Sequence, residues 1–158
     1  MFKIVLVSGQ SMIPTLRHGE RVLAWTPFAR QFFKRGEIVT LSHVHLHLPT
    51  DTQSDAGFRT PIAGIQQEQP ELFVKRIMGL PGDTVRIPVH QLSHHIPAAV
   101  DPQARRDGSD WVWRIPDDHV FIRGDGPYST DSVVWGPVPF TQLRQVVLCR
   151  FPSFQRIS

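Results

Sequence analysis

The chain has 158 residues, 41% of them hydrophobic, which suits one folded core and leaves little material for a second. The net charge of +3 would suit an anionic membrane surface, but the basic residues are scattered, so charge identifies no class of partner and predicts no nucleic-acid binding. Cys149 is the only cysteine, which excludes an intrachain disulfide and a cysteine-based zinc site.

Short apolar segments rich in Val, Ile and Phe alternate with 14 prolines and 11 glycines. This pattern predicts a mainly β fold with few long helices, organised as one domain over residues 1–158. The apolar run at residues 4–7 is far shorter than the roughly 20 residues of a membrane-spanning helix, so we expect no span in this chain.

The first predicted strand covers residues 1–7 and ends where Pro14 removes a backbone donor. Residues 19–25 and 36–41 are predicted to form a pair of strands. The three phenylalanines between them either touch lipid or pack on the sheet: Phe28, Phe32 and Phe33.

Two polar stretches, at about 49–70 and 90–110, are predicted to be insertions, the first of them an exposed loop. Further strands are expected at residues 72–78, 84–87, 111–115 and 146–149, with a glycine-proline turn at 79–83. Cys149 is expected to be a small residue of a buried strand.

Two side chains suggest nucleophilic catalysis. Ser11 lies in the segment Ser-Gly-Gln-Ser-Met-Ile-Pro-Thr-Leu (8–16), and Lys75 lies in Val-Lys-Arg-Ile-Met-Gly-Leu-Pro-Gly-Asp (74–83). A serine hydroxyl becomes a strong nucleophile when a base takes its proton, and a lysine that burial keeps neutral is such a base. Ser11 and Lys75 fit these two roles.

A third segment, Gly-Asp-Gly-Pro-Tyr-Ser-Thr-Asp-Ser (124–132), completes a resemblance. In their order and spacing the three segments, with Arg35–Val39 between the first two, resemble the boxes of type I signal peptidases, including the mitochondrial inner-membrane peptidases. The resemblance implies a signal-peptidase-like catalytic β domain with an active-site groove and no cofactor. The implied substrates are precursor proteins with signal or leader peptides, cut after small residues.

The resemblance also implies roles for single residues. Ser129 matches the serine that orients the lysine, and supporting positions match Asp125, Asp131 and Ser132. Met12 matches a substrate-pocket position, and Gly9 stands where some members place an oxyanion-stabilising serine. Two departures affect the last segment: Gly126 stands where asparagine is common, and Val133 stands where arginine usually pairs with the aspartate matching Asp131.

Members of this family work at the outer face of the bacterial plasma membrane or at the mitochondrial inner membrane. The resemblance therefore implies membrane association, through peripheral contact or through an anchor that precedes the present chain.

Three alternatives stay open. The chain is a non-catalytic peptide-binding remnant of the same fold, or it matures one dedicated partner, or it belongs to the self-cleaving serine-lysine regulators. The last is disfavoured because only ten residues precede Ser11. Separately, His43, His45 and His47 would share one face of a strand, where they could hold a metal ion. The same alternation is typical of a half-exposed strand, and no acidic or cysteine residue lies beside them, so we predict no metal site.

Overall fold

The computed structural model describes residues 1–42, 72–92 and 100–157, and it is mainly β, as predicted. Short helical turns join the strands: η1 (Arg30–Phe32), η2 (Val89–Gln91), η3 (Phe140–Gln142) and α1 (Ser132–Trp135). The strands are β1 (Phe2–Leu6), β2 (Arg21–Trp25), β3 (Ile38–Leu41), β4 (Phe73–Gly79), β5 (Thr84–Pro88), β6 (Arg105–Asp107), β7 (Asp110–Arg114), β8 (His119–Arg123), β9 (Val138–Pro139) and β10 (Leu143–Phe151). Among the described residues, no helix is long and apolar enough to cross a membrane.

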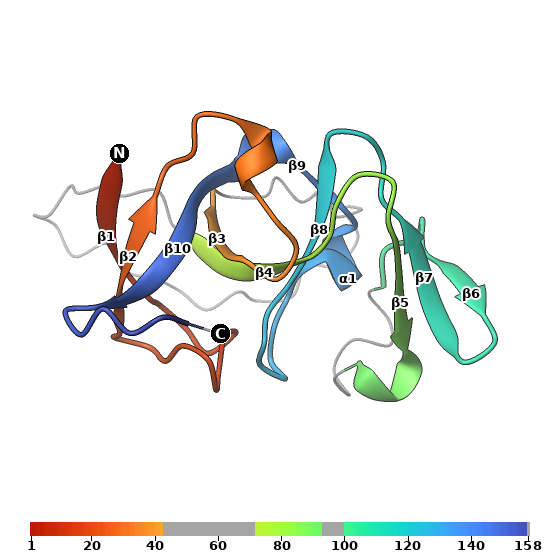
Figure 1. Cartoon of the computed structure of the whole chain (residues 1–158). Coiled ribbons are helices and arrows are strands. Elements are labelled where there is room, and N and C mark those ends of the chain that lie inside the picture. Colours follow the sequence, from red (N-terminus) through yellow and green to blue (C-terminus); the bar gives the residue numbers. More distant parts are fainter. Residues whose placement is uncertain (43–71, 93–99, 158) are drawn as a thin grey trace, which may run out of the picture.

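The strands form two antiparallel sheets. A seven-stranded sheet has the order β1-β2-β10-β3-β4-β8-β9, and a three-stranded sheet has the order β5-β7-β6. In Figure 1 the smaller sheet lies beside β8, at the end of the molecule opposite β1. The active-site candidates therefore belong to the larger sheet and to the loops around it.

The predicted pairing of the strands at 19–25 and 36–41 is wrong, because β10 lies between β2 and β3 and pairs with both (Figure 1). Strands adjacent in sequence commonly pair, which is the rule that failed here. The last long strand of the chain has buried positions along its first half and fits the centre of the sheet better than its edge.

Part of the second predicted insertion has regular structure. Within 90–110, β6 pairs with β7, and all three residues of β6 are exposed, which suits a polar edge strand. The first predicted insertion, 49–70, and the row His43, His45 and His47 lie outside the described residues. The single-domain prediction stays a prediction.

Among the described residues, buried side chains form three core clusters. The first joins Met12 and Leu16, which follow the candidate nucleophile, to Val74, which precedes the candidate base. The second lies between β3, β4, β8 and β10, and the third packs the smaller sheet onto β8. Cys149 is half-buried, in contrast to the expected fully buried strand.

Candidate active site

Ser11 lies in a turn that buried neighbours fix in place. Gly9 has φ of +84°, a left-handed conformation that glycine adopts without steric cost, and the Ile13 amide donates to the Gln10 carbonyl 3.2 Å away. Met12 is 2% exposed and packs in the core, whereas Ser11 remains half-buried. The loop thus holds the serine at the margin of the core.

Lys75 is buried on β4, where its side chain is 3% exposed. Its Nζ donates a hydrogen bond to Oγ of Ser129 over 3.2 Å, so the lysine and the serine of the third segment lie together. Burial lowers the Lys75 pKa from 10.5 to about 8, although the charge of Asp131 acts in the opposite direction. A substantial fraction of such a lysine is neutral just above neutral pH.

Asp131 and Ser132 hold the backbone around the site. The Asp131 carboxylate accepts hydrogen bonds from the Gly124 amide at 3.0 Å and from the Val133 amide at 3.1 Å, the second bond capping α1. The Ser132 hydroxyl accepts from the Ile122 amide at 3.0 Å. Backbone donors thus occupy the carboxylate of Asp131, for which the resemblance implied an arginine partner at the position of Val133.

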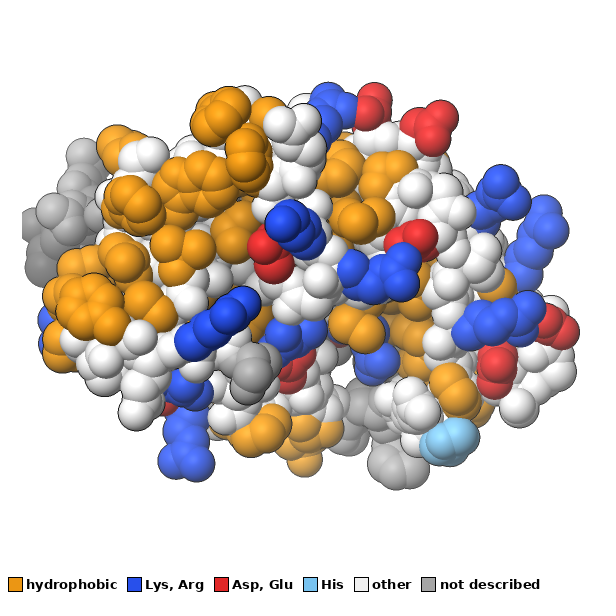
Figure 2. Space-filling view, in the orientation of Figure 1, with side chains coloured by type: hydrophobic (Ala, Val, Ile, Leu, Met, Phe, Trp, Pro, Cys, Tyr) orange, Lys and Arg blue, Asp and Glu red, His pale blue; other side chains and the backbone are white. Residues whose placement is uncertain are grey.

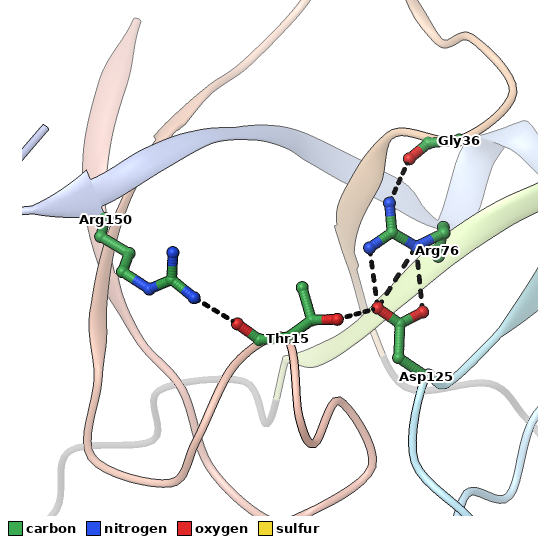
Figure 3. A network of polar contacts seen from close by, with 5 residues as sticks. All are labelled: Thr15, Gly36, Arg76, Asp125 and Arg150. Carbon is green, nitrogen blue, oxygen red and sulfur yellow. Dashed lines mark hydrogen bonds and ion pairs between the residues drawn. The ribbon is translucent and has the colours of Figure 1, made fainter. Parts of the chain in front are cut away.

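Asp125 is the centre of a polar network that joins three segments of the chain (Figure 3). Its carboxylate accepts from Nη2 of Arg76 at 2.7 Å and from Oγ1 of Thr15 at 2.6 Å. Burial alone would raise the Asp125 pKa, but the hydrogen bonds from Arg76 and Thr15 and the nearby positive charges hold it below its ordinary value. Asp125 is therefore a charged brace.

Two further contacts extend this network. Arg76 also donates to the Gly36 carbonyl at 2.7 Å, and Arg150 donates to the Thr15 carbonyl at 2.6 Å (Figure 3). Thr15 and Arg76 lie within the first two motifs, but the motifs predict no role for either residue. One sequence feature could have indicated the pair: Arg76 is a cation next to Lys75, and Asp125 is an acidic residue of the third motif without a predicted partner.

The third segment approaches the serine loop so closely that only glycine fits at two positions. A Cβ on Gly124 would lie 2.2 Å from Oγ of Ser129 and 2.4 Å from the Ser11 carbonyl oxygen. A Cβ on Gly126 would lie 2.7 Å from the Gln10 carbonyl oxygen, and the Gly126 amide donates to the Ser11 carbonyl at 2.8 Å. This contact accounts for glycine at position 126.

A cavity of about 300 Å³ opens between the serine loop and β4. Ser11 and Lys75 both line it, as does Gly9, whereas Met12 does not. In the described part of the chain, no hydrogen bond joins the Ser11 hydroxyl to Lys75. The remaining lining residues are Ser8, Gln10, Leu72, Phe73, Val74, Tyr128, Thr130 and Trp135.

The arrangement offers a hydroxyl and a largely buried amine on one accessible cavity, which suits nucleophilic chemistry on an acyl group. Within residues 1–42, 72–92 and 100–157, no group of three or more His, Cys, Asp and Glu side chains is placed to hold a metal ion.

Comparisons with known proteins show which proteins the chain is similar to. The family model "Signal peptidase, peptidase S26" matches residues 1–151. Signal peptidase I of Bacillus amyloliquefaciens is 32% identical over 138 residues, which cover 79% of this chain and 61% of that protein. Mitochondrial inner membrane protease subunit 1 of Schizosaccharomyces pombe is 28% identical over 151 residues, covering 95% of this chain and 73% of that protein.

A third relative is the probable signal peptidase I-2 of Synechocystis, 29% identical over 161 residues that cover 96% of this chain and 64% of that protein. The matched region thus spans less than two thirds of both bacterial relatives.

Proposed function

The chain belongs to the S26 signal peptidase family, and from this membership we propose that it is a serine endopeptidase that removes signal or leader peptides from precursor proteins. The observation that carries the proposal is the buried Lys75, whose pKa is lowered to about 8 and which shares a cavity with Ser11. A lysine of this kind serves as a general base near neutral pH.

In the proposed reaction, Oγ of Ser11 attacks the carbonyl carbon of the scissile peptide bond while Nζ of Lys75 takes the hydroxyl proton. The tetrahedral intermediate collapses as Lys75 returns that proton to the leaving amine, which gives an ester on Ser11. A water molecule, deprotonated by Lys75, then attacks the ester carbonyl, and Lys75 gives the proton to Oγ of Ser11 as the acid product leaves. Ser129 keeps the lysine amine in place through its hydrogen bond.

The proposed oxyanion donor is the backbone amide of Ser11. Gly9 has no side chain and supplies no hydroxyl there, and losing one donor typically costs roughly a hundredfold or more in rate. We therefore expect an enzyme slower than members that have a serine at this position.

The cavity suits an extended peptide bound beside residues 72–75, with small residues before the cut. Gly9 is proposed to leave room for the substrate. Met12 packs in the core and does not line the cavity. We propose that it shapes the pocket indirectly, by holding the serine loop in place.

Membrane contact is proposed through an apolar surface on β1, β2 and the segment after β2 that ends in η1. This surface, here called the β1–β2 patch, is made of Phe2, Ile4, Leu6, Leu23, Trp25, Phe28 and Phe32. Phe2, Ile4 and Leu6 are 63%, 53% and 64% exposed, and Phe28 is 84% exposed. Phe32 meets Trp25 edge-to-face and packs at a tilt on Phe28, whereas Phe33 packs on Phe140, so the phenylalanines divide between surface and core. Figure 2 shows hydrophobic side chains gathered over β1 and β2. Such a patch suits a lipid surface.

The test is cleavage of a detergent-solubilised precursor with an Ala-x-Ala site from pH 6 to pH 10. We expect the intact chain to cut, with a rate that rises through about pH 8 as Lys75 loses its proton. Ser11→Ala and Lys75→Ala should be inactive, whereas Lys34→Ala, at an exposed lysine, should keep the intact rate and pH profile.

Three outcomes would change the proposal. Cleavage by Ser11→Ala at the intact rate removes the nucleophile assignment. Saturable peptide binding with no turnover at any pH identifies a non-catalytic peptide-binding protein instead. A panel of precursors in which only one protein is cut identifies a dedicated maturation protease.

A further inference from the structure

A second cavity, of about 290 Å³, lies beside β5 and shares no lining residue with the cavity that contains Ser11. Three arginines line it, Arg35 before β3, Arg86 on β5 and Arg123 at the end of β8, together with one acidic residue, Asp83. On the face shown in Figure 2, Lys and Arg side chains gather in the region of β4 and β5. The proposed peptidase chemistry uses none of these residues.

Arg123 is the least satisfied of these three arginines in its hydrogen bonds, although its charge lies near enough to Asp125 to help lower the pKa of that carboxyl. The pairing of β4 with β8 puts Arg123 directly opposite Arg76, and like charges at such positions repel. Asp125 forms the ion pair with Arg76, whereas Nε of Arg123 is buried without a hydrogen-bond partner. Within the described residues Arg123 has no ion-pair partner either. A buried donor in this state favours an acceptor from outside the chain.

The other two arginines retain free donors. Arg35 uses Nη2 in its 2.5 Å ion pair with Asp83, and Arg86 uses Nη1 in its 2.6 Å ion pair with Asp107. Both arginine side chains are more than half exposed, so these ion pairs are weak and readily rearranged. A guanidinium has five N–H donors, which leaves several on each residue for a ligand.

We propose that this cavity binds a phosphoryl group, supplied as inorganic phosphate or as the headgroup of an anionic phospholipid. Guanidinium groups match phosphate oxygens in bidentate geometry, and three of them around one cavity suit an anion with several acceptor oxygens. A single carboxylate ligand fits less well, because it has fewer acceptor oxygens to share among three arginines. The site is independent of the peptidase function.

The experiment uses the purified full chain labelled with ¹⁵N and monitors the arginine Nε–H signals while inorganic phosphate is added at constant ionic strength. We expect the Arg123 signal to shift and saturate. Arg123→Gln and Arg86→Gln should each weaken phosphate binding at least tenfold. Arg30→Gln removes a surface arginine outside the cavity and should leave the affinity unchanged. Arg86 is 53% exposed, so its variant tests the site even if Arg123→Gln fails to fold.

Flotation with neutral phosphatidylcholine vesicles, and with vesicles that also contain phosphatidylglycerol, separates the two sources. Stronger binding to anionic vesicles that Arg123→Gln abolishes and added phosphate inhibits supports a lipid headgroup. Phosphate binding without a vesicle difference supports free phosphate. The proposal is overturned if phosphate causes no saturable shift, if Arg30→Gln weakens binding as much as Arg123→Gln, or if only an acidic peptide binds in an Arg123-dependent manner.

Discussion

Lys75 shows how one side chain can be costly for folding and useful for chemistry. Burial lowers the Lys75 pKa, which would fit the amine to act as a base. The same burial destabilises the folded protein whenever the amine is charged, because the charge has been removed from water. In the described part of the fold, the Lys75 amine donates a hydrogen bond to Ser129, which partly offsets this cost. Lys75 and Ser129 therefore make opposing contributions to folding stability, and the balance depends on pH.

We predict that Lys75→Met stabilises the protein at neutral pH. The folded-state pKa, about 8, lies below the ordinary 10.5, so between these values the unfolded chain binds more protons and stability rises with pH. The burial penalty is fully present below pH 8. After allowance for the lost bond to Ser129, the substitution should add about 2 kcal/mol at pH 7 and almost nothing at pH 10.5.

Urea unfolding of both proteins at several pH values between 7 and 10.5 measures this difference. Lys34→Met, at an exposed lysine, is the matched control and should show no pH-dependent change. A Lys75→Met protein that is less stable than the intact chain at pH 7 would contradict the assigned pKa direction.

At the scale of elements, the site depends on how the segment 124–132 docks against the serine loop and β4. Asp125 and Thr15 join the two loops, and Arg76 extends that link to the strand bearing Lys75 (Figure 3). Gly124 and Gly126 allow the backbones to approach. The position of Ser11 relative to Lys75 thus depends on the Thr15–Asp125–Arg76 network and on the close approach at the two glycines.

We predict that Asp125→Asn lowers the stability by about 2 kcal/mol at pH 7, because Arg76 loses its charged partner in a half-buried site. The Asp125 pKa is held below its ordinary 3.8, so the stabilisation is present above that value and is lost as pH falls through the folded-state pKa. Thermal unfolding from pH 7 to pH 2 should show the two proteins converging in acid.

Asp118→Asn serves as the control, because its ion pair with Arg30 lies on the surface, where the Asp118 side chain is 71% exposed. Equal losses for both variants would mean that the network around Asp125 is no more important than a surface ion pair.

Gly124→Ala should reduce both stability and turnover. The added Cβ meets Oγ of Ser129 and the Ser11 carbonyl at distances that force a shift, which typically costs about 1–3 kcal/mol. Because Ser129 contacts Lys75, we expect kcat to fall at least tenfold while KM changes little. Steady-state kinetics and urea unfolding measure the two effects.

Gly108→Ala is the comparison for this variant. Gly108 has φ of +59° and no neighbour within 4 Å, so alanine there costs about 1 kcal/mol through backbone strain alone. Its kcat should be unchanged. If Gly124→Ala also kept the intact kcat, close packing at 124 would have no bearing on catalysis.

At the scale of the whole molecule, the strand order separates three surfaces. β1 forms one edge of the larger sheet and carries much of the β1–β2 patch, the cavity with Ser11 opens beside β4, and the arginine-lined cavity lies beside β5. Apolar and basic surfaces of this kind are the two features that lipid binding uses.

We predict that the double substitution Phe2→Ser and Phe28→Ser weakens binding to neutral vesicles at least tenfold, because each exposed phenylalanine would otherwise bury apolar surface in the lipid. Val89→Ser alters an exposed apolar residue on η2, outside the patch, and should bind like the intact chain. Vesicle flotation gives the comparison, and equal binding by all three proteins would rule out the β1–β2 patch as the lipid contact.

The sequence by itself determined the strand-rich class, most strand positions and the family, because glycine-proline punctuation and three ordered motifs are local features that need no partner to be recognised. These motifs also predict that Ser11, Lys75 and Ser129 are active-site residues. Their catalytic roles remain predictions for the cleavage assay.

Only the tertiary structure decided which segments meet. It inserted β10 between β2 and β3, joined Arg76 and Thr15 to Asp125, and packed Gly126 on the serine loop. It also lowered the Lys75 pKa through burial. The physical reason is that strand pairing, side-chain burial and pKa shifts depend on distances between residues far apart in the chain. Local sequence patterns do not specify those distances.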